Sequence, residues 1–257
     1  IFRHLKLHFK ALFADIFYPD QLLQRNKMLY NRHKGETCFI LGSGPSIQQQ
    51  DLTKLAGKTV ITQNHFHSHK DIGIINPRYH VVVPKYQSTN FDADWEKWLL
   101  SMNEKLPKTT EFIFDKNTKY LIDKLKLFEN RVWYIRQGYN CMLIRQAPYN
   151  LTRSLMAVPT VLPECLAVAI YMGFAKIYLL GFDMNQPFIA SQKKNVRFYS
   201  SSPIITNRAE KELDEAAMKQ GFVWINYWFI WCQCNMLNQI ARKKGIFCQS
   251  SPFEASY

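Results

Sequence analysis

A glycine-rich turn follows the first apolar run of the sequence. The run Thr37–Leu41 predicts a buried strand, and the segment Gly42-Ser43-Gly44-Pro45-Ser46 comes directly after it. Glycine permits positive φ angles and close approach of the backbone, and proline suits the first turn of a helix. Main-chain N–H groups left free in such a turn can bind a phosphate. Because the turn lacks the lysine of a P-loop, it predicts nucleotide binding without a Mg²⁺-dependent triphosphate reaction.

Polar residues also follow two later apolar runs. Asn64 comes shortly after the run Thr59–Thr62, and its amide could pair with a ribose or a base. Gly181 and Asp183 follow the run Lys176–Leu180. An acid at the end of such a strand often touches sugar hydroxyls or acts on the substrate. A hydrogen bond that fixes the loop explains Asp183 equally well.

A predicted helix from Pro163 to Met172 begins with two further candidates. Thr160 and the exposed amides at the start of this helix could bind an anion, and Glu164 would interact favourably with the helix dipole. Helix capping alone also accounts for Thr160. These residues therefore count as functional candidates only together with the glycine turn.

Histidines and cysteines do not form a recognisable metal motif. His65, His67 and His69 stand at alternate positions and would share one face if the preceding strand continued through them. The six cysteines, at positions 38, 141, 165, 232, 234 and 248, lack zinc-like spacing, and reduced thiols are the plain interpretation. We expect no metal site, because metal ligands usually come from several segments of a chain.

Alternation of strands and helices predicts the fold. The strands are apolar on both sides, which indicates a mostly parallel, Rossmann-like α/β sheet with helices on both faces. Residues 1–32 read as a basic helical segment, and residues 33–257 as one Rossmann-like domain. The remaining predicted strands are Tyr79–Val83, Phe112–Phe114, Val132–Ile135 and Ile246–Cys248, and the remaining helices are Trp95–Met102, Tyr120–Leu127, Ala209–Lys219 and Tyr227–Lys244.

The net charge of +13 calls for an anionic partner or a solvated face. A basic amphipathic helix in residues 1–30 could lie on an anionic membrane surface, and packing on the domain itself is an equal alternative. We expect no nucleic-acid partner, because no nucleic-acid-binding signature accompanies the charge. No apolar run approaches the roughly 20 residues of a membrane span.

Three motifs together resemble a known family. The segment GSGPSI after one strand, QN after the next, and AVAIYMGFAKIYLLGFDMN resemble the bacterial sialyltransferase-like glycosyltransferases. This superfamily includes enzymes that use CMP-activated nonulosonic acids or Kdo in lipopolysaccharide and capsule synthesis. The segments NRHKGETCFILGSGPS and RKKGIFCQSSPFE resemble polysaccharide-biosynthesis proteins of the same superfamily. The resemblance implies a CMP-sugar donor, a saccharide or lipid-linked acceptor, and no cofactor or catalytic metal. Reduced thiols indicate a cytoplasmic protein, and the basic N-terminal segment fits an enzyme that is peripheral at the inner face of the cytoplasmic membrane.

The resemblance also assigns site residues. It places the CMP part of the donor against a nucleotide site of Gly42, Ser43, Gly44, Pro45, Ser46, Asn64, Thr160, Gly181 and Asn185. Asn185 stands where the family has a tyrosine that touches phosphate. The family's catalytic histidine lies downstream of the strand tip, yet no histidine follows His80 in this chain. The segment Arg197-Phe198-Tyr199 occupies the approximate place of that histidine.

Four residues are therefore the predicted catalytic set. Arg197 and Tyr199 could stabilise the departing phosphate as a permanent cation and a hydroxyl donor. Asp183 or Glu164 could serve as the base, or as a nucleophile in a double displacement. Two alternatives stay open. One is a non-catalytic sugar- or nucleotide-binding module of envelope assembly, and the other is a pterin diphosphokinase-like enzyme that moves pyrophosphate from ATP.

Overall fold

The computed structural model describes residues 17, 19–82, 92–138, 149–155, 160–183 and 222–250, without the side chains of 222–227. The predicted helix Ala209–Lys219 and the predicted site residues Asn185, Arg197 and Tyr199 lie outside these residues. The strands are β1 (Thr37–Leu41), β2 (Thr59–Gln63), β3 (Tyr79–Val81), β4 (Glu111–Asp115), β5 (Val132–Ile135), β6 (Lys176–Leu180) and β7 (Phe247–Ser250). The α-helices are α2 (Gln21–Gln24), α3 (Ile72–Ile75), α4 (Asp92–Lys105), α5 (Lys119–Leu125), α6 (Leu162–Tyr171) and α9 (Phe222–Lys243). Short 3₁₀ helices are η1 (Arg25–Leu29), η2 (Pro45–Gln49), η3 (Leu52–Leu55), η4 (Asn64–Ser68) and η5 (Lys116–Thr118).

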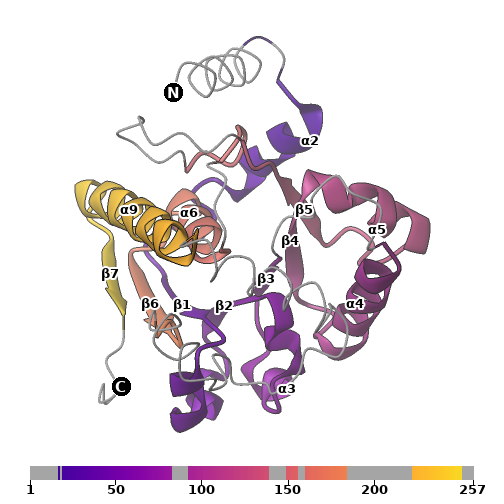
Figure 1. The fold of residues 1–257 in the computed structure, drawn as a ribbon, viewed down its shortest axis with the longest axis horizontal. Helices are drawn as coiled ribbons and strands as arrows, with labels where there is room; N and C mark the ends of the chain where they lie inside the picture. The colour runs from indigo at the N-terminus through magenta and orange to yellow at the C-terminus, as the bar shows by residue number, and fades with distance from the viewer. Residues whose placement is uncertain are drawn as a thin grey trace.

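The seven strands form one sheet in the order β5-β4-β3-β2-β1-β6-β7 (Figure 1). Every neighbouring pair is parallel, so the predicted parallel, Rossmann-like α/β sheet is confirmed. From β1 to β5 each strand is added on the same side of its predecessor, and β6 then returns to the other side of β1. The strand order therefore reverses between β1 and β6. Such a switch point opens a crevice at the carboxyl ends of the two strands. We call the edge of the sheet where the strands end the carboxyl edge.

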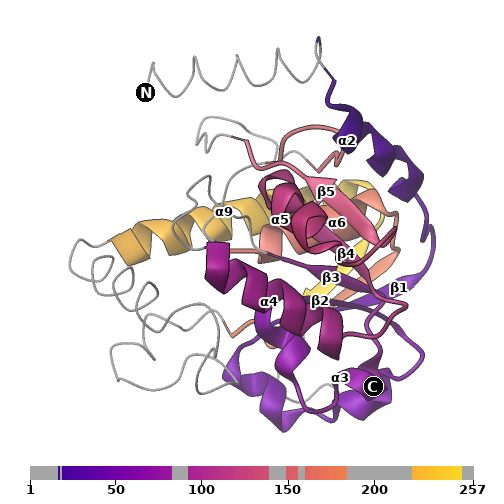
Figure 2. The same ribbon diagram turned by 90° about the vertical axis from the view of Figure 1, so that its right-hand side faces the viewer.

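Helices cover both faces of the sheet, because alternate strand residues point to opposite faces. Cys38 and Ile40 of β1 belong to the core beneath α6 and α9, whereas Leu41 belongs to the core beneath η3 and α3. In β4 the rings of Phe112 and Phe114 pack with α4 and α5 on this second face. Figure 2 shows α9 and α6 on one side of the strands and α4 and α3 on the other. Both sides of each central strand are thus buried, which explains their uninterrupted apolar sequences.

The described part of the predicted N-terminal segment packs against the sheet. Leu23 and Leu29 are fully buried, and Leu29 lies in the core beneath α6. The buried Asn26 donates from Nδ2 to the carbonyl oxygens of Tyr134 at 2.7 Å and Leu151 at 2.8 Å. This part of the segment is therefore anchored to the domain through Leu23, Asn26 and Leu29. Of the stretch expected to reach a membrane, residues 1–30, the first 16 residues lie outside the described residues.

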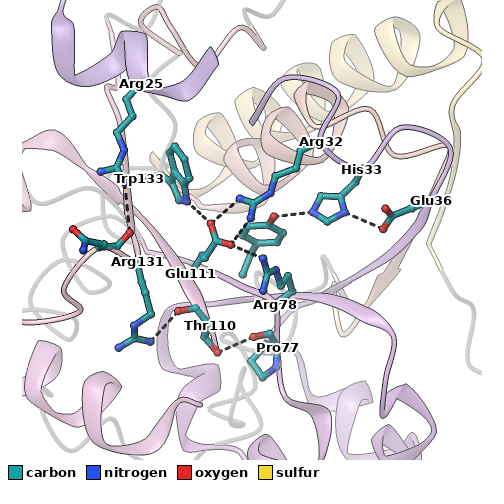
Figure 3. Close-up of polar contacts among 12 residues, drawn as sticks. Arg25, Arg32, His33, Glu36, Pro77, Arg78, Thr110, Glu111, Arg131 and Trp133 are labelled. Carbon is teal, nitrogen blue, oxygen red and sulfur yellow. Dashed lines mark hydrogen bonds and ion pairs between the residues drawn. The ribbon is translucent and has the colours of Figure 1, made fainter. Parts of the chain in front are cut away.

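A charged network holds the amino ends of the strands, on the edge opposite to the carboxyl edge (Figure 3). Glu111 at the start of β4 accepts two hydrogen bonds from Arg32, at 2.8 and 2.9 Å. It also accepts from Arg78 at 2.7 Å and from the indole N–H of Trp133 at 2.6 Å. These donors hold the pKa of Glu111 below its usual value, against the opposing effect of burial. The network ties η1, β3, β4 and β5 together and leaves the opposite edge to the site.

None of the described helices is both long and apolar enough to span a bilayer.

Candidate functional site

The glycine turn and the tip of β6 meet at the switch point. The turn (Gly42–Ser46) follows β1, and the β6 tip (Gly181–Asp183) follows the adjacent strand, so both lie at the carboxyl edge. The amide of Gly42 donates to the carbonyl oxygen of Leu180 at 2.7 Å, and that of Gly44 donates to Gly181 at 2.8 Å. The structure therefore joins two motifs that lie far apart in the sequence.

Close packing of these two segments explains the glycines. A Cβ on Gly44 would lie 2.5 Å from Oδ2 of Asp183 and 2.8 Å from the carbonyl oxygen of Gly181. Gly181 itself has φ of +71°, and a Cβ there would meet the carbonyl oxygen of Gly42 at 2.8 Å. Side chains at these positions would separate the turn from the tip. The glycines are thus required by the protein's own packing, whatever ligand the turn holds.

Hydrogen bonding within the protein also uses most amides of the turn. Besides Gly42 and Gly44, Ser46 donates its N–H to Oδ2 of Asp183 at 3.0 Å. Pro45 has no N–H. Ser43 is half-buried, and it is the turn residue for which the described part of the chain supplies no hydrogen bond. Among the described contacts, the Ser43 N–H is therefore the amide of the turn that is left to bind a phosphate.

Asp183 ties the β6 tip to the turn. Its two carboxylate oxygens accept from the N–H and the hydroxyl of Ser46. A carboxylate at the start of a short helix is the usual partner of its first amides. Of the two roles open from the sequence, these contacts favour the loop-fixing one. The carboxylate that was predicted as a base is engaged with Ser46.

Asn64 begins the 3₁₀ helix η4, so the polar segment after β2 turns away from strand geometry. Its φ of +46° is a left-handed value that asparagine tolerates better than most residues. Because η4 contains His65 and His67, the alternate-position face that a strand would have created does not form. Within the described ranges, no group of three or more His, Cys, Asp or Glu side chains is arranged to hold a metal ion.

The histidines after β2 belong to the core instead. His67 places Nδ1 at 3.0 Å from the carbonyl oxygen of Asn64 and Nε2 at 3.3 Å from the hydroxyl of Ser101. Burial lowers the pKa of His67 to about 4. His80, fully buried in β3, lies with Nδ1 at 2.8 Å from the hydroxyl of Thr62, and burial lowers its pKa well below the usual value. Both rings are neutral at pH 7 and point to structural roles.

Glu164 is a buried acid at the start of α6. Its Oε1 accepts from the side-chain amide of Gln137, and its Oε2 has no hydrogen-bond partner among the described residues. Burial raises its pKa to about 8, so the group is protonated at neutral pH. A protonated carboxyl is neither a base nor a nucleophile, and these two predicted roles do not fit Glu164 at pH 7. Val161, and not Thr160, occupies the N-cap position of α6, where no side chain caps the helix.

Sequence reasoning missed two residues that complete this part of the edge. Asp115, at the end of β4, accepts from the amide of Asn117 at 2.9 Å and from the amide of Gln137 at 3.2 Å. Burial raises the pKa of Asp115. The signal was available, because Asp115 follows an apolar strand in the same way as Asp183 does. Gln137 lies two residues beyond β5 and carried no comparable signal.

Comparison with known proteins yields structural similarity alone. No protein-family model matches the chain, and no curated protein matches it. The chain is similar to the sialyltransferase CstII from Campylobacter jejuni in complex with the substrate analogue cytidine-5'-monophosphate, at 15% identity over 84% of this chain and 80% of that one, with a TM-score of 0.44. A second structure, of CST-II with a trisaccharide acceptor and CMP, gives 15% identity, the same coverage and a TM-score of 0.41. Prephenate dehydrogenase from A. aeolicus, in complex with hydroxyphenyl propionate and NAD⁺, gives 11% identity, 81% and 87% coverage, and a TM-score of 0.24.

Proposed function

We propose that this protein is a glycosyltransferase that moves a sialic acid-like keto-sugar or Kdo from its CMP form to a saccharide or lipid-linked acceptor of the cell surface. One observation carries the proposal. The glycine turn stands at the topological switch point of a parallel sheet, against the Gly-Phe-Asp tip of the neighbouring strand. Ligands of open α/β sheets bind in the crevice at this point. Two of the three sequence motifs that resemble sialyltransferase-like enzymes, the glycine turn and the segment that ends in Gly181-Phe182-Asp183, meet there.

In this proposal the chain's own residues first bind and orient the nucleotide. Ser43 offers its amide and hydroxyl from the turn, and Asn64 begins the next loop one strand away. Asp183 holds the turn in shape through Ser46. As the donor's phosphate departs, negative charge develops on it, and Arg197 and Tyr199 are the proposed groups that stabilise this charge. Asn185, Thr160 and Gly181 complete the proposed nucleotide site.

Nucleotide titration tests the donor class. Isothermal titration calorimetry with CMP, CTP, UDP, GDP and ATP should show tighter binding of the cytidine nucleotides. In Gly44→Ala the new methyl group collides with Asp183, so CMP affinity should fall at least tenfold. Gly73→Ala is the matched control, because a Cβ there meets no atom within 4 Å, and it should bind CMP as the parent protein does. Equal affinity for all five nucleotides would contradict the proposal.

The states of the Asp183 and Glu164 carboxyl groups support a second candidate function. Asp183 is engaged with Ser46 and Glu164 is protonated, so neither described candidate is a free carboxylate base. This arrangement favours a nucleotide- or sugar-binding module without turnover. Release of CMP from a CMP-sugar in the presence of acceptor saccharides separates the two functions. CMP binding without any release would favour the module.

The same proposal includes a membrane-proximal acceptor. The basic residues 1–16, which precede the part that packs against the domain, are then the part that lies on anionic lipid at the cytoplasmic face. Co-sedimentation with phosphatidylglycerol vesicles, with and without residues 1–16, tests this part. Equal sedimentation of the two chains would refute it.

A further inference from the structure

A second polar group stands on the carboxyl edge, at the ends of β4 and β5. It consists of Asp115 after β4, Gln137 after β5 and Glu164 in the first turn of α6, and we call it the Asp115–Gln137–Glu164 cluster. The exposed fractions of Asp115 and Glu164 are each 2%, whereas Gln137 is half-buried. Gln137 is therefore the member of the cluster that a ligand reaches.

Gln137 is held from three sides. Its amide N–H donates to Asp115, and its side-chain Nε2 donates to Oε1 of Glu164. The residues on either side of it pair with Leu155, through Gly138 N–H to the Leu155 carbonyl at 2.6 Å and Leu155 N–H to the Arg136 carbonyl at 2.8 Å. Such contacts fix both the main chain and the direction of the side-chain amide. Preorganised polar groups of this kind are characteristic of binding sites.

One buried polar atom of the cluster, Oε2 of Glu164, has no hydrogen-bond partner among the described residues. The side-chain carbonyl of the half-buried Gln137 is the other end of the amide that donates to Oε1 of Glu164. A buried polar atom without a partner costs about 1–3 kcal/mol, so such atoms are rare unless a ligand or water satisfies them.

The first turn of α6 connects the cluster to the end of β2. Cys165, next to Glu164 in α6, has its Sγ at 3.9 Å from Oε1 of Gln63, the last residue of β2. β2 pairs with β1, from which the turn begins, and neighbouring strands lie about 5 Å apart. β2 and β3 lie between β1 and the strands that carry Asp115 and Gln137, so a ligand anchored at the turn reaches the cluster across the ends of these two strands.

We propose that Gln137 binds a hydroxyl group of the sugar in a nucleotide sugar, with Glu164 and Asp115 as the residues that position it. This inference rests on the proposed function and adds the sugar end of the site. The side-chain carbonyl of Gln137 accepts the hydroxyl's hydrogen bond, and Glu164 keeps the amide turned in that direction. A site that hydrogen-bonds a substrate hydroxyl discriminates strongly against ligands that lack it.

Affinity for two ligands tests the inference. Isothermal titration calorimetry is carried out with CMP and with CMP-N-acetylneuraminic acid, on the full chain and on Gln137→Leu. The parent protein should bind the CMP-sugar at least tenfold more tightly than CMP. Gln137→Leu should lose this tenfold advantage and keep its CMP affinity within twofold. Gln239→Leu, an exposed position on α9, is the matched control and should keep both affinities. If Gln137→Leu does not fold, Gln137→Asn withdraws the amide by one methylene and serves in its place.

A separate variant tests whether Glu164 positions Gln137. Glu164→Ala should reduce the ratio of CMP-sugar to CMP affinity, whereas a purely structural Glu164 would lower the melting temperature and leave the ratio unchanged. An unchanged ratio in both Gln137→Leu and Glu164→Ala overturns the inference while the proposed function stands. A parent protein that binds the CMP-sugar no better than CMP also overturns the inference alone. Absence of CMP binding by the parent protein overturns the proposed function, and the inference with it.

Discussion

Acidification should destabilise this protein through His67, whose buried ring is neutral in the folded state. Nδ1 faces the carbonyl oxygen of Asn64, which can only accept, so Nδ1 carries the proton. Nε2 then accepts from the hydroxyl of Ser101. A second proton on Nε2 would reverse the direction of that hydrogen bond, because the hydroxyl can also accept, and would place a charge in a site that is 2% exposed. The ring of His80, at 6.2 Å between centroids, lies in the same buried region and adds an effect of the same sign.

The magnitude follows from the pKa difference. The unfolded chain binds the proton with a pKa near 6.5 and the folded chain with a pKa of about 4. Between these values the unfolded state binds more protons, so the free energy of unfolding falls as the pH falls, and the loss is complete below pH 4. At 1.36 kcal/mol for each unit the full loss is about 3.4 kcal/mol, of which about 2 kcal/mol appears between pH 7 and pH 5. This is a large part of an ordinary stability of roughly 5–15 kcal/mol.

Urea unfolding at pH 7, 6, 5 and 4.5 measures the effect. His67→Gln keeps a polar side chain that does not titrate, so the difference in pH dependence between the two proteins isolates His67. The parent protein should lose about 2 kcal/mol more than His67→Gln between pH 7 and pH 5. Parallel stability curves for the two proteins would refute the reasoning and would mean that water reaches the ring of His67.

Three further predictions concern stability. Glu164, with a raised pKa of about 8, should cost the parent protein about 2.5 kcal/mol of stability between pH 6 and pH 9, and urea titrations of Glu164→Gln should show no such loss. Gly44→Ala should lower stability by about 1–3 kcal/mol because its methyl group overlaps Asp183, whereas thermal unfolding of Gly73→Ala should show no loss. Glu111→Ala removes the common hydrogen-bond partner of Arg32, Arg78 and Trp133. The free energy of unfolding, measured with denaturant, should fall by about 2 kcal/mol, a value that already allows for the partial exposure of both arginines. Asp123→Ala is the control for Glu111→Ala. It breaks the exposed Lys119–Asp123 ion pair of α5, and its free energy of unfolding, measured with denaturant, should change by less than about 0.5 kcal/mol.

Much of the fold could be predicted from local sequence patterns. The strands Thr37–Leu41, Val132–Ile135 and Lys176–Leu180 have the expected bounds, because each is a short apolar run closed by polar or glycine residues. The order of the strands could not be predicted. No local sequence pattern indicates that Lys176–Leu180 pairs with Thr37–Leu41, because most of the domain lies between the two runs in the sequence. Their pairing depends on packing the whole sheet between its helices.

Part of the candidate site could likewise be predicted from the sequence, and part could not. The glycine turn could be predicted from residue types alone, because glycine marks positions where the backbone adopts conformations or close approaches that other residues do not permit. The engagement of Asp183 with Ser46 was not found, because it joins residues 137 positions apart. Gln137 was missed altogether, since glutamine has no chemistry of its own until neighbours orient it. The sequence did not show whether the strand continued through the three histidines after β2. The structure has η4 there instead, and all three rings are buried.

By itself the sequence determined the α/β class, the positions of most strands and the residue types at their ends, because burial and backbone preference are local properties. Only the tertiary structure decided which strand ends are neighbours, which carboxyl groups are buried and whether a given polar group is already bound. Those properties depend on distance and on exclusion of water, and both are set by the packed sheet as a whole. Glu164 shows the difference most clearly: the same residue type is an anion on an exposed helix and a neutral acid beneath Gln137.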